Sequence, residues 1–94
     1  MPTKSKNEYK DFTVVISSPR WKEKKLGRLG AWGLYYDDGQ IEIDPRLESK
    51  DYLDTLIHEM LHHHFPELKE EDVEIIATKM AKELWKANYR KIKK

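Results

Sequence analysis

Residues 53–62, LDTLIHEMLH, decide the fold. Their apolar side chains recur every three or four positions, which is the spacing of one face of an α-helix. Asp51 suits the first turn of such a helix, because the positive end of the helix dipole attracts a negative charge. The helix has to stop before Pro66, since the residue that precedes a proline avoids the helical conformation. We therefore predict a helix over residues 48–64, with an apolar stripe made of Leu53, Leu56, Ile57, Met60 and Leu61.

A second amphipathic helix is predicted over residues 69–90, after a short turn. Glu70 and Glu71 lie in its first turn, where negative charges are again favourable. Because the turn at residues 65–68 is short, the two helices should be neighbours and roughly antiparallel. The apolar stripe of this helix contains Val73, Ile76, Ala77, Met80, Ala81, Leu84 and Ala87.

The first half of the chain contains the strand candidates. Residues 12–16, FTVVI, are rich in β-branched side chains and predict a strand. Residues 21–28 fit either a loop or a short helical turn. Two apolar-aromatic runs, 31–36 and 40–44, flank the Asp-Asp-Gly at 37–39. This arrangement predicts a hairpin, because glycine readily adopts the turn conformation.

Apolar and acidic residues alternate in the second run of the hairpin. Ile41 and Ile43 should face the core, whereas Glu42 and Asp44 should face water, as in an exposed strand. The chain is therefore expected to be a single α+β domain with a short antiparallel sheet packed on two consecutive helices. By range, we expect a flexible segment at 1–10, the sheet at 11–44, the site helix at 48–64 and the second helix at 69–90.

Composition limits the size of the core and the classes of function. With 94 residues, 38% of them hydrophobic and 37% charged, the domain can bury only a thin core. Such domains often need disulfides, a metal ion or oligomerisation, and the absence of cysteine excludes disulfides and cysteine zinc sites. The formal net charge of +1 argues against a dedicated nucleic-acid binder. Neither a membrane span nor a signal peptide is evident, so we expect a cytoplasmic protein with no membrane partner.

His58, Glu59 and His62 form an H-E-x-x-H motif on the first helix. Residues four apart share a helix face, so the two imidazoles can converge on one metal ion. Glu59 projects about 100° away from His58, which suits a group that takes a proton from water better than one that binds the metal. Both motif histidines project beside the apolar stripe. His63 should face solvent, whereas His64 lies inside the stripe and should be a partly buried histidine that is hydrogen-bonded at the helix end.

A catalytic zinc site needs a third protein ligand and one open position. Neither remaining histidine projects toward the pair, so the third ligand should be a carboxylate. Glu70 and Glu74 both fit, since both lie near the start of the second helix and beside its apolar stripe. Asp51 and Thr55 share the face of the motif histidines and are candidates to accept the second N–H of each ring.

The motif and its surroundings resemble the zincin metallopeptidases. The resemblance rests on the hairpin end at 41–46, IEIDPR, and on the segments 54–62, DTLIHEMLH, 65–73, FPELKEEDV, and 81–85, AKELW. These segments are similar to short phage and bacterial zinc peptidases in the style of minigluzincins and of SprT-like and ImmA-type proteases. The similarity extends over about residues 40–90.

The resemblance implies a zinc-dependent peptidase that hydrolyses peptide or protein substrates. A glutamate three residues before a valine recurs in this group, and here it is Glu70, so the resemblance favours Glu70 over Glu74. The implied site holds one Zn²⁺ per chain between His58, His62 and that glutamate, with Glu59 as the general base. In zincins an edge strand holds the substrate backbone, and the matching residues here are Ile41, Glu42 and Ile43.

Two positions depart from the family pattern. His63 stands where these proteins usually carry a small residue after the second histidine. Thr78 stands where larger gluzincins carry an aspartate. The group that would stabilise a developing oxyanion stays open among Tyr35, Tyr36, Tyr52 and Tyr89.

Two other functions fit the sequence. A metal-stabilised binding module without turnover would use the ion to reinforce the thin core. A phage-type nucleic-acid accessory protein would use the basic stretches at 20–25 and 90–94, and the H-E-x-x-H would then be incidental.

Overall fold

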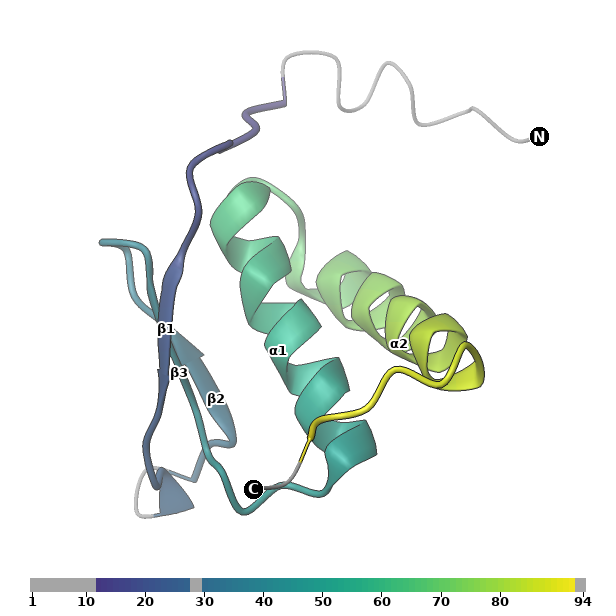
Figure 1. Ribbon diagram of the computed structural model, residues 1–94. Coiled ribbons are helices and arrows are strands. Elements are labelled where there is room, and N and C mark those ends of the chain that lie inside the picture. Colours follow the sequence, from purple (N-terminus) through teal and green to yellow (C-terminus); the bar gives the residue numbers. More distant parts are fainter. Residues whose placement is uncertain (1–11, 28–29, 93–94) are drawn as a thin grey trace, which may run out of the picture.

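The computed structural model describes residues 12–27 and 30–92, so the segment 1–10 that the sequence predicts to be flexible lies outside the described residues. Those residues form an α+β domain, as predicted, with the strands before the helices (Figure 1). In chain order the elements are β1 (Arg20–Glu23), β2 (Gly33–Tyr35), β3 (Gln40–Ile43), α1 (Ser49–His64) and α2 (Glu70–Lys86).

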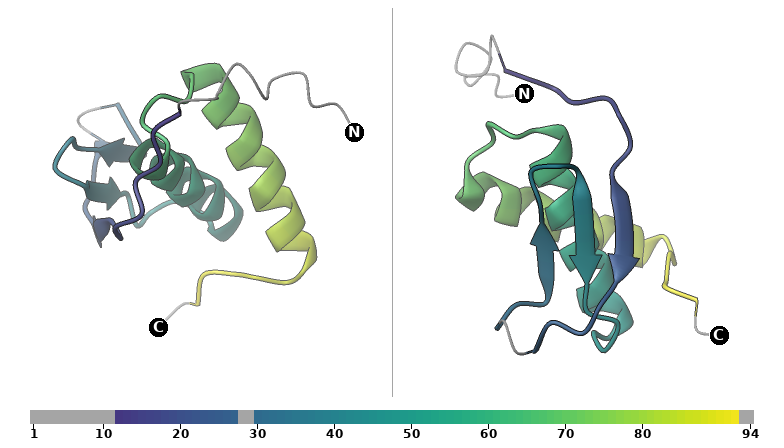
Figure 2. Two further views of the ribbon diagram at one scale, coloured as in Figure 1. Left: turned by 90° about the horizontal axis from the view of Figure 1, so that it is seen from above. Right: turned by 90° about the vertical axis from the view of Figure 1, so that its left-hand side faces the viewer.

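The strands form one mixed sheet in the order β1-β3-β2. The predicted hairpin is confirmed, because β2 and β3 pair antiparallel with Gly33 opposite Ile43 and Tyr35 opposite Ile41. Gly39 lies in its turn at a φ of 92°, a conformation that glycine adopts without strain. β1 is parallel to β3, so the prediction of a wholly antiparallel sheet is wrong for one strand (Figure 2).

The strand predicted at 12–16 is wrong, and a strand lies at Arg20–Glu23 instead. Residues 12–16 run beside the C-terminal end of α1, where the Val15 N–H donates to the His64 carbonyl oxygen at 2.8 Å. β-Branched residues favour extended backbone, but they do not decide whether its partner is a strand or a helix end. All four residues of β1 are exposed, so no alternation of buried and exposed positions marks this strand in the sequence.

The two acidic residues of the hairpin are buried, which corrects the prediction that they face water. Because β3 is the central strand, Glu42 and Asp44 are only 3% and 0% exposed. Glu42 accepts a hydrogen bond from the Tyr36 hydroxyl at 2.9 Å. Asp44 accepts the Leu26 N–H at 2.8 Å and two bonds from the Arg46 guanidinium at 2.9 and 2.6 Å. Each buried carboxylate therefore has hydrogen-bond donors that replace water.

α1 is the central layer of the domain, with the sheet on one face and α2 on the other (Figure 1, Figure 2). Within the described residues α2 packs on α1 and has no contact with the strands, although the sequence suggested a sheet packed on both helices. The core between the helices consists of Ile57, Leu61, Val73, Ala77 and Ala81. The smaller core between α1 and the sheet consists of Ile41, Ile43 and Tyr52.

α2 ends at Lys86, earlier than the sequence predicts, because a C-terminal cap stops it. Asn88 adopts a φ of 74° and its N–H donates to the Trp85 carbonyl oxygen at 2.9 Å. The Tyr89 N–H donates to the Leu84 carbonyl oxygen at 3.0 Å, which completes a Schellman motif. No described helix combines the length and the apolar character that crossing a membrane requires.

Candidate metal centre

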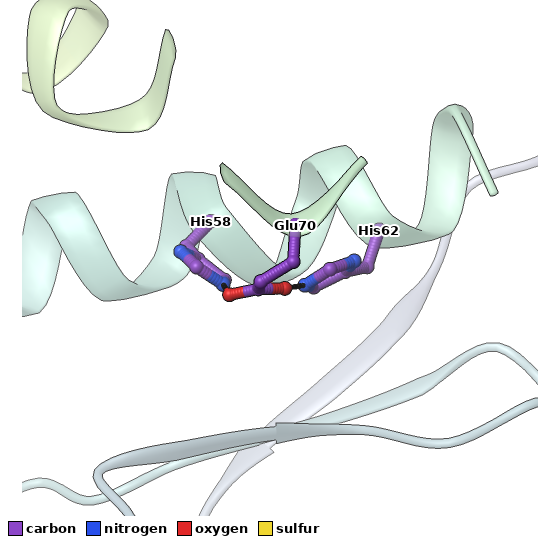
Figure 3. A group of neighbouring side chains, drawn as sticks. All are labelled: His58, His62 and Glu70. Carbon is purple, nitrogen blue, oxygen red and sulfur yellow. Dashed lines mark ion pairs between the residues drawn. The ribbon is translucent and has the colours of Figure 1, made fainter. Parts of the chain in front are cut away.

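Both histidines of the H-E-x-x-H motif and one carboxylate lie together between α1 and α2 (Figure 3). His58 and His62 are one helical turn apart on α1, and Glu70 is the first residue of α2. Glu70 Oε2 lies 3.1 Å from His58 Nε2, and Glu70 Oε1 lies 2.9 Å from His62 Nε2. The structure thus brings together the residues that the family resemblance favours, whereas Glu74 is outside this group.

These three side chains, which we call the metal group, could hold a metal ion. Each residue offers one ligand atom, and these atoms lie within 4.8 Å of one another. Ligand atoms bonded to a tetrahedral zinc at about 2.0–2.1 Å are about 3.3 Å apart, so small side-chain rotations would satisfy that geometry. Two imidazoles and one carboxylate are also a donor set of catalytic zinc sites, in which one position stays open.

The turn between α1 and α2 brings Glu70 next to His58 and His62, and contacts with Phe12 and Thr13 stabilise that turn. Phe12 stacks on Phe65 with ring centroids 5.9 Å apart. Thr13 donates to the Glu67 carboxylate from its N–H at 3.2 Å and from its hydroxyl at 2.9 Å. The third member of the metal group is therefore positioned both by the helix packing and by a segment distant in sequence.

Glu59 is only 8% exposed, and it faces the sheet side of the metal group. Burial raises the pKa of Glu59 above its ordinary value, the charge of Glu70 acts in the same direction, and His58 opposes both. No hydrogen bond from the described residues reaches its carboxylate. A carboxyl group with a raised pKa titrates closer to neutral pH, which suits it to exchange a proton with a reactant.

Gly33 allows β2 to approach Glu59 closely. A Cβ atom at this position would lie 2.6 Å from Thr55 Cγ2 and 3.2 Å from Glu59 Oε2. At a contact below 3.0 Å, either the Thr55 side chain or the strand would have to shift. The sequence does not predict this role, because the packing of β2 on α1 is a contact between segments that are distant in sequence.

The metal group and Glu59 line one cleft of about 500 Å³, which we call the metal cleft. α1 forms its floor, the chain that leads into β2 forms one wall, and the first turns of α2 form the other. Its lining consists of Gly30, Ala31, Trp32, Gly33, Asp54, Thr55, His58, Glu59, Glu70 and Glu74.

The sequence predicts that Ile41, Glu42 and Ile43 hold the substrate backbone at a sheet edge. This prediction is wrong, because these residues belong to β3, the central strand. β3 has a partner strand on both sides, so its backbone groups are already paired. The strand beside the metal cleft is β2, and no described strand pairs with its outer edge. The Trp32 carbonyl oxygen and the Tyr36 N–H form hydrogen bonds with the backbone of Asp44 and Gln40 on the β3 side. The N–H and C=O groups of the alternate residues Gly33 and Tyr35 therefore point toward the open edge.

His63 is 5% exposed, which overturns the prediction that it faces solvent. Its Nδ1 lies 3.1 Å from the Tyr35 hydroxyl and its Nε2 lies 2.8 Å from the Ser17 carbonyl oxygen. His64 is half-buried, as predicted, and its Nδ1 lies 2.7 Å from the Val15 carbonyl oxygen. The prediction for His63 is wrong because it considered only the apolar stripe of α1. His63 lies on another face of the helix, which is covered by Tyr35 of β2 and by Ser17.

Asp51 and Thr55 do not hold the imidazole rings, contrary to prediction. Neither residue forms a hydrogen bond with His58 or His62 in the part of the chain that the structure describes. Asp51 is exposed beside a neighbouring hollow, and Thr55 turns its methyl group toward β2.

The tyrosine candidates for stabilising an oxyanion are engaged outside the metal cleft, and none of them lines it. The Tyr35 hydroxyl contacts His63, and Tyr89 lies at a separate groove beside Trp21. The remaining two hydroxyls donate to buried or paired carboxylates, from Tyr36 to Glu42 and from Tyr52 to Glu23.

The basic stretches have intramolecular partners in the described residues. Lys24 Nζ lies 4.0 Å from the Glu42 carboxylate, and the Arg90 guanidinium lies 3.4 Å from the centre of the Trp85 ring. The end of the second stretch, at 93–94, lies outside the described residues. A nucleic-acid function therefore stays a prediction.

Comparisons of the chain with protein-family models, with curated proteins and with solved structures find no match. The functional interpretation rests on the geometry of the chain's own residues. Two features are central, namely the candidate metal ligands between the helices and Glu59, which lines the same cleft.

Proposed function

We propose that this protein is a minimal zinc-dependent peptidase. The observation that supports this most strongly is Glu59, a carboxylate that is buried beside the metal group and lacks a hydrogen-bond donor in the described residues. Its side chain lines the metal cleft beside the three candidate ligands, and a carboxyl group with a raised pKa at such a place is a candidate for a chemical role. The resemblance of the surrounding segments to zincins agrees with this reading.

The substrate backbone would bind along the outer edge of β2. An extended peptide can add to an open sheet edge through main-chain hydrogen bonds, which makes binding tolerant of side-chain identity. Gly33 and Tyr35 present their backbone groups to that edge, and Gly33 also lines the metal cleft. A peptide bound there would pass the metal group.

The protein's own groups would divide the chemistry between them. His58, His62 and Glu70 would hold zinc, which, when bound, polarises a carbonyl group and acidifies water. Glu59 would accept a proton from the attacking water and return it to the leaving amine, so that one water is consumed for each peptide bond broken. The raised pKa of Glu59 suits both transfers.

The substitution Glu59→Gln tests this assignment, because it keeps the side-chain shape and removes the base. We expect the variant to bind one zinc per chain and to lose peptide hydrolysis by about 10²- to 10⁴-fold. Zinc content is measured by elemental analysis, and hydrolysis with casein and a mixed peptide library. Glu71→Gln, an exposed change outside the cleft, serves as the control and should retain full activity. Unchanged hydrolysis by Glu59→Gln would falsify the assignment.

A metal-stabilised binding module is the second candidate, and the layer arrangement favours it. α2 packs only on α1 in the described chain, so an ion held by His58, His62 and Glu70 would cross-link the two helices. Both candidates predict that a chelator lowers the melting temperature. Only the peptidase predicts zinc-dependent cleavage that disappears in Glu59→Gln.

A further inference from the structure

We propose that the metal cleft selects peptides with a lysine or arginine within about three residues of the scissile bond, on its C-terminal side. This inference rests on the proposed function and names the substrate class of the same site. It is carried by a second hollow next to the metal cleft and by the charges that line both.

The second hollow, which we call the acidic hollow, has a volume of about 660 Å³. It adjoins the metal cleft, because Trp32, Asp54 and Thr55 line both. The remaining lining residues are Arg46, Leu47, Glu48 and Asp51. A substrate side chain that leaves the metal cleft along α1 would therefore enter this hollow.

Negative charge is concentrated in the two hollows. Apart from Glu59 and Glu70, whose charges the proposed metal would offset, their combined lining contains four carboxylates, from Glu48, Asp51, Asp54 and Glu74, although the whole chain has a net charge of +1. The one arginine in the lining, Arg46, is bonded twice to the buried Asp44 and so is already neutralised. The potential of the hollows therefore attracts a cation.

Two further observations indicate that a ligand enters here. Glu59 is 8% exposed, lacks a hydrogen bond from the described residues and faces into the metal cleft, as expected of a group that acts on a ligand. Trp32 is 53% exposed at the junction of the two hollows. The Arg46 guanidinium lies 6.0 Å from the centre of the Trp32 ring, and the exposed part of the indole could cover the aliphatic stem of a lysine.

The direction of β2 decides which side of the scissile bond bears the charge. Gly33 contacts Thr55 and Glu59, and Tyr35 contacts His63, so β2 runs in the same direction as α1. A peptide paired antiparallel with β2, which is the commoner arrangement, runs toward the acidic hollow at its C-terminal end. Asp54 and Asp51 precede His58 by about 6 and 10 Å along the helix, which is two to three residues of extended peptide.

The test compares the binding of labelled alanine-rich peptides that differ at one position, which carries lysine, norleucine or glutamate. Norleucine keeps the aliphatic stem and removes the charge. Affinity for the wild-type protein, with and without zinc, is measured by fluorescence anisotropy, so the result does not depend on turnover. We expect the lysine peptide to bind about fivefold more tightly than the norleucine peptide at low salt, and the ratio to fall in 0.5 M NaCl.

Two variants and a control locate the charge that is responsible. Asp51→Asn, alone and with Asp54→Asn, should remove most of the lysine preference. Glu83→Gln removes an exposed charge elsewhere on α2 and should leave the preference unchanged. Equal affinities for the lysine and norleucine peptides, or a preference that survives the double variant, would overturn the inference. A lysine preference without any hydrolysis would overturn only the proposed function.

Discussion

α1 carries two pairs of histidines whose environments are opposite. His63 and His64 hydrogen-bond to main-chain carbonyl groups of residues 15–17, and His63 also contacts Tyr35. His58 and His62 face the metal cleft and share Glu70 as their partner. One pair is therefore part of the framework that holds the N-terminal segment, and the other could hold a metal ion together with Glu70.

Two buried acids show the same contrast. Asp44 is completely surrounded by donors, and the Arg46 guanidinium holds the pKa of that carboxyl well below its usual range. Glu59 has no such donors among the described residues, and burial raises its pKa. Satisfied polar groups stabilise a fold, whereas a carboxyl group that lines a cleft and has a raised pKa is a candidate for chemistry.

The largest difference between the two histidine pairs should appear in zinc affinity. His62→Ala removes a ligand and should weaken zinc binding by more than about 100-fold, because even the outer partners of metal ligands contribute 10- to 100-fold. Competition with a chromogenic chelator measures this affinity. Circular dichroism checks that the variant is folded. Retention of wild-type affinity would remove His62 from the site.

The two candidate carboxylates should also differ. Glu70→Gln should weaken zinc binding by about 10- to 100-fold, since it removes the charged ligand. Glu74→Gln is the matched control on the same helix and should change the affinity by less than about threefold, because Glu74 acts only through screened charge. The reverse order of the two effects would make Glu74 the third ligand.

His63→Ala should affect stability and leave zinc binding intact. It removes both contacts of a buried ring and leaves the Ser17 carbonyl oxygen and the Tyr35 hydroxyl without that partner. We expect the free energy of unfolding in urea to fall by about 1–3 kcal/mol, with zinc affinity unchanged. His63→Gln can restore one hydrogen bond and should recover part of the loss. A large loss of zinc affinity would instead place His63 at the metal.

Asp44→Asn should destabilise the fold by an amount that depends on pH. The folded-state pKa of Asp44 is lowered, so its ionised form stabilises the fold above the usual carboxyl pKa of about 4. This stabilisation is lost as the pH falls from about 4 through the lower folded-state pKa. The melting temperature of Asp44→Asn should thus be lower than that of the wild type at pH 7, and the gap should narrow toward pH 2. The exposed Asp37→Asn is the control, and a gap that does not change with pH would contradict the account.

The features that the sequence predicts correctly are local. The period of residues 53–62 predicts α1, Asp-Asp-Gly predicts the hairpin, and the four-residue spacing of His58 and His62 predicts their shared face. The short turn at 65–68 brings the start of α2 to that face, which is why Glu70 could be named.

The features that the sequence does not predict depend on contacts between distant segments. All four residues of β1 are exposed, so only its pairing with β3 reveals it as a strand. That same pairing makes β3 the central strand and buries Glu42. The strand with an open edge beside the metal cleft is therefore β2, whereas the sequence suggested β3. Tyr35 of β2 and Ser17 cover His63, and the spacing of apolar residues along the helix does not predict either contact.

The central claim is that His58, His62 and Glu70 hold one zinc ion and leave a position open beside Glu59. Anomalous scattering at the zinc edge from crystals of the zinc-loaded protein tests it most directly. We predict a single peak bonded at about 2.0–2.2 Å to both Nε2 atoms and to a Glu70 oxygen, with the fourth position facing the metal cleft. A peak elsewhere, no peak, or an ion closed by a fourth protein ligand would contradict the claim.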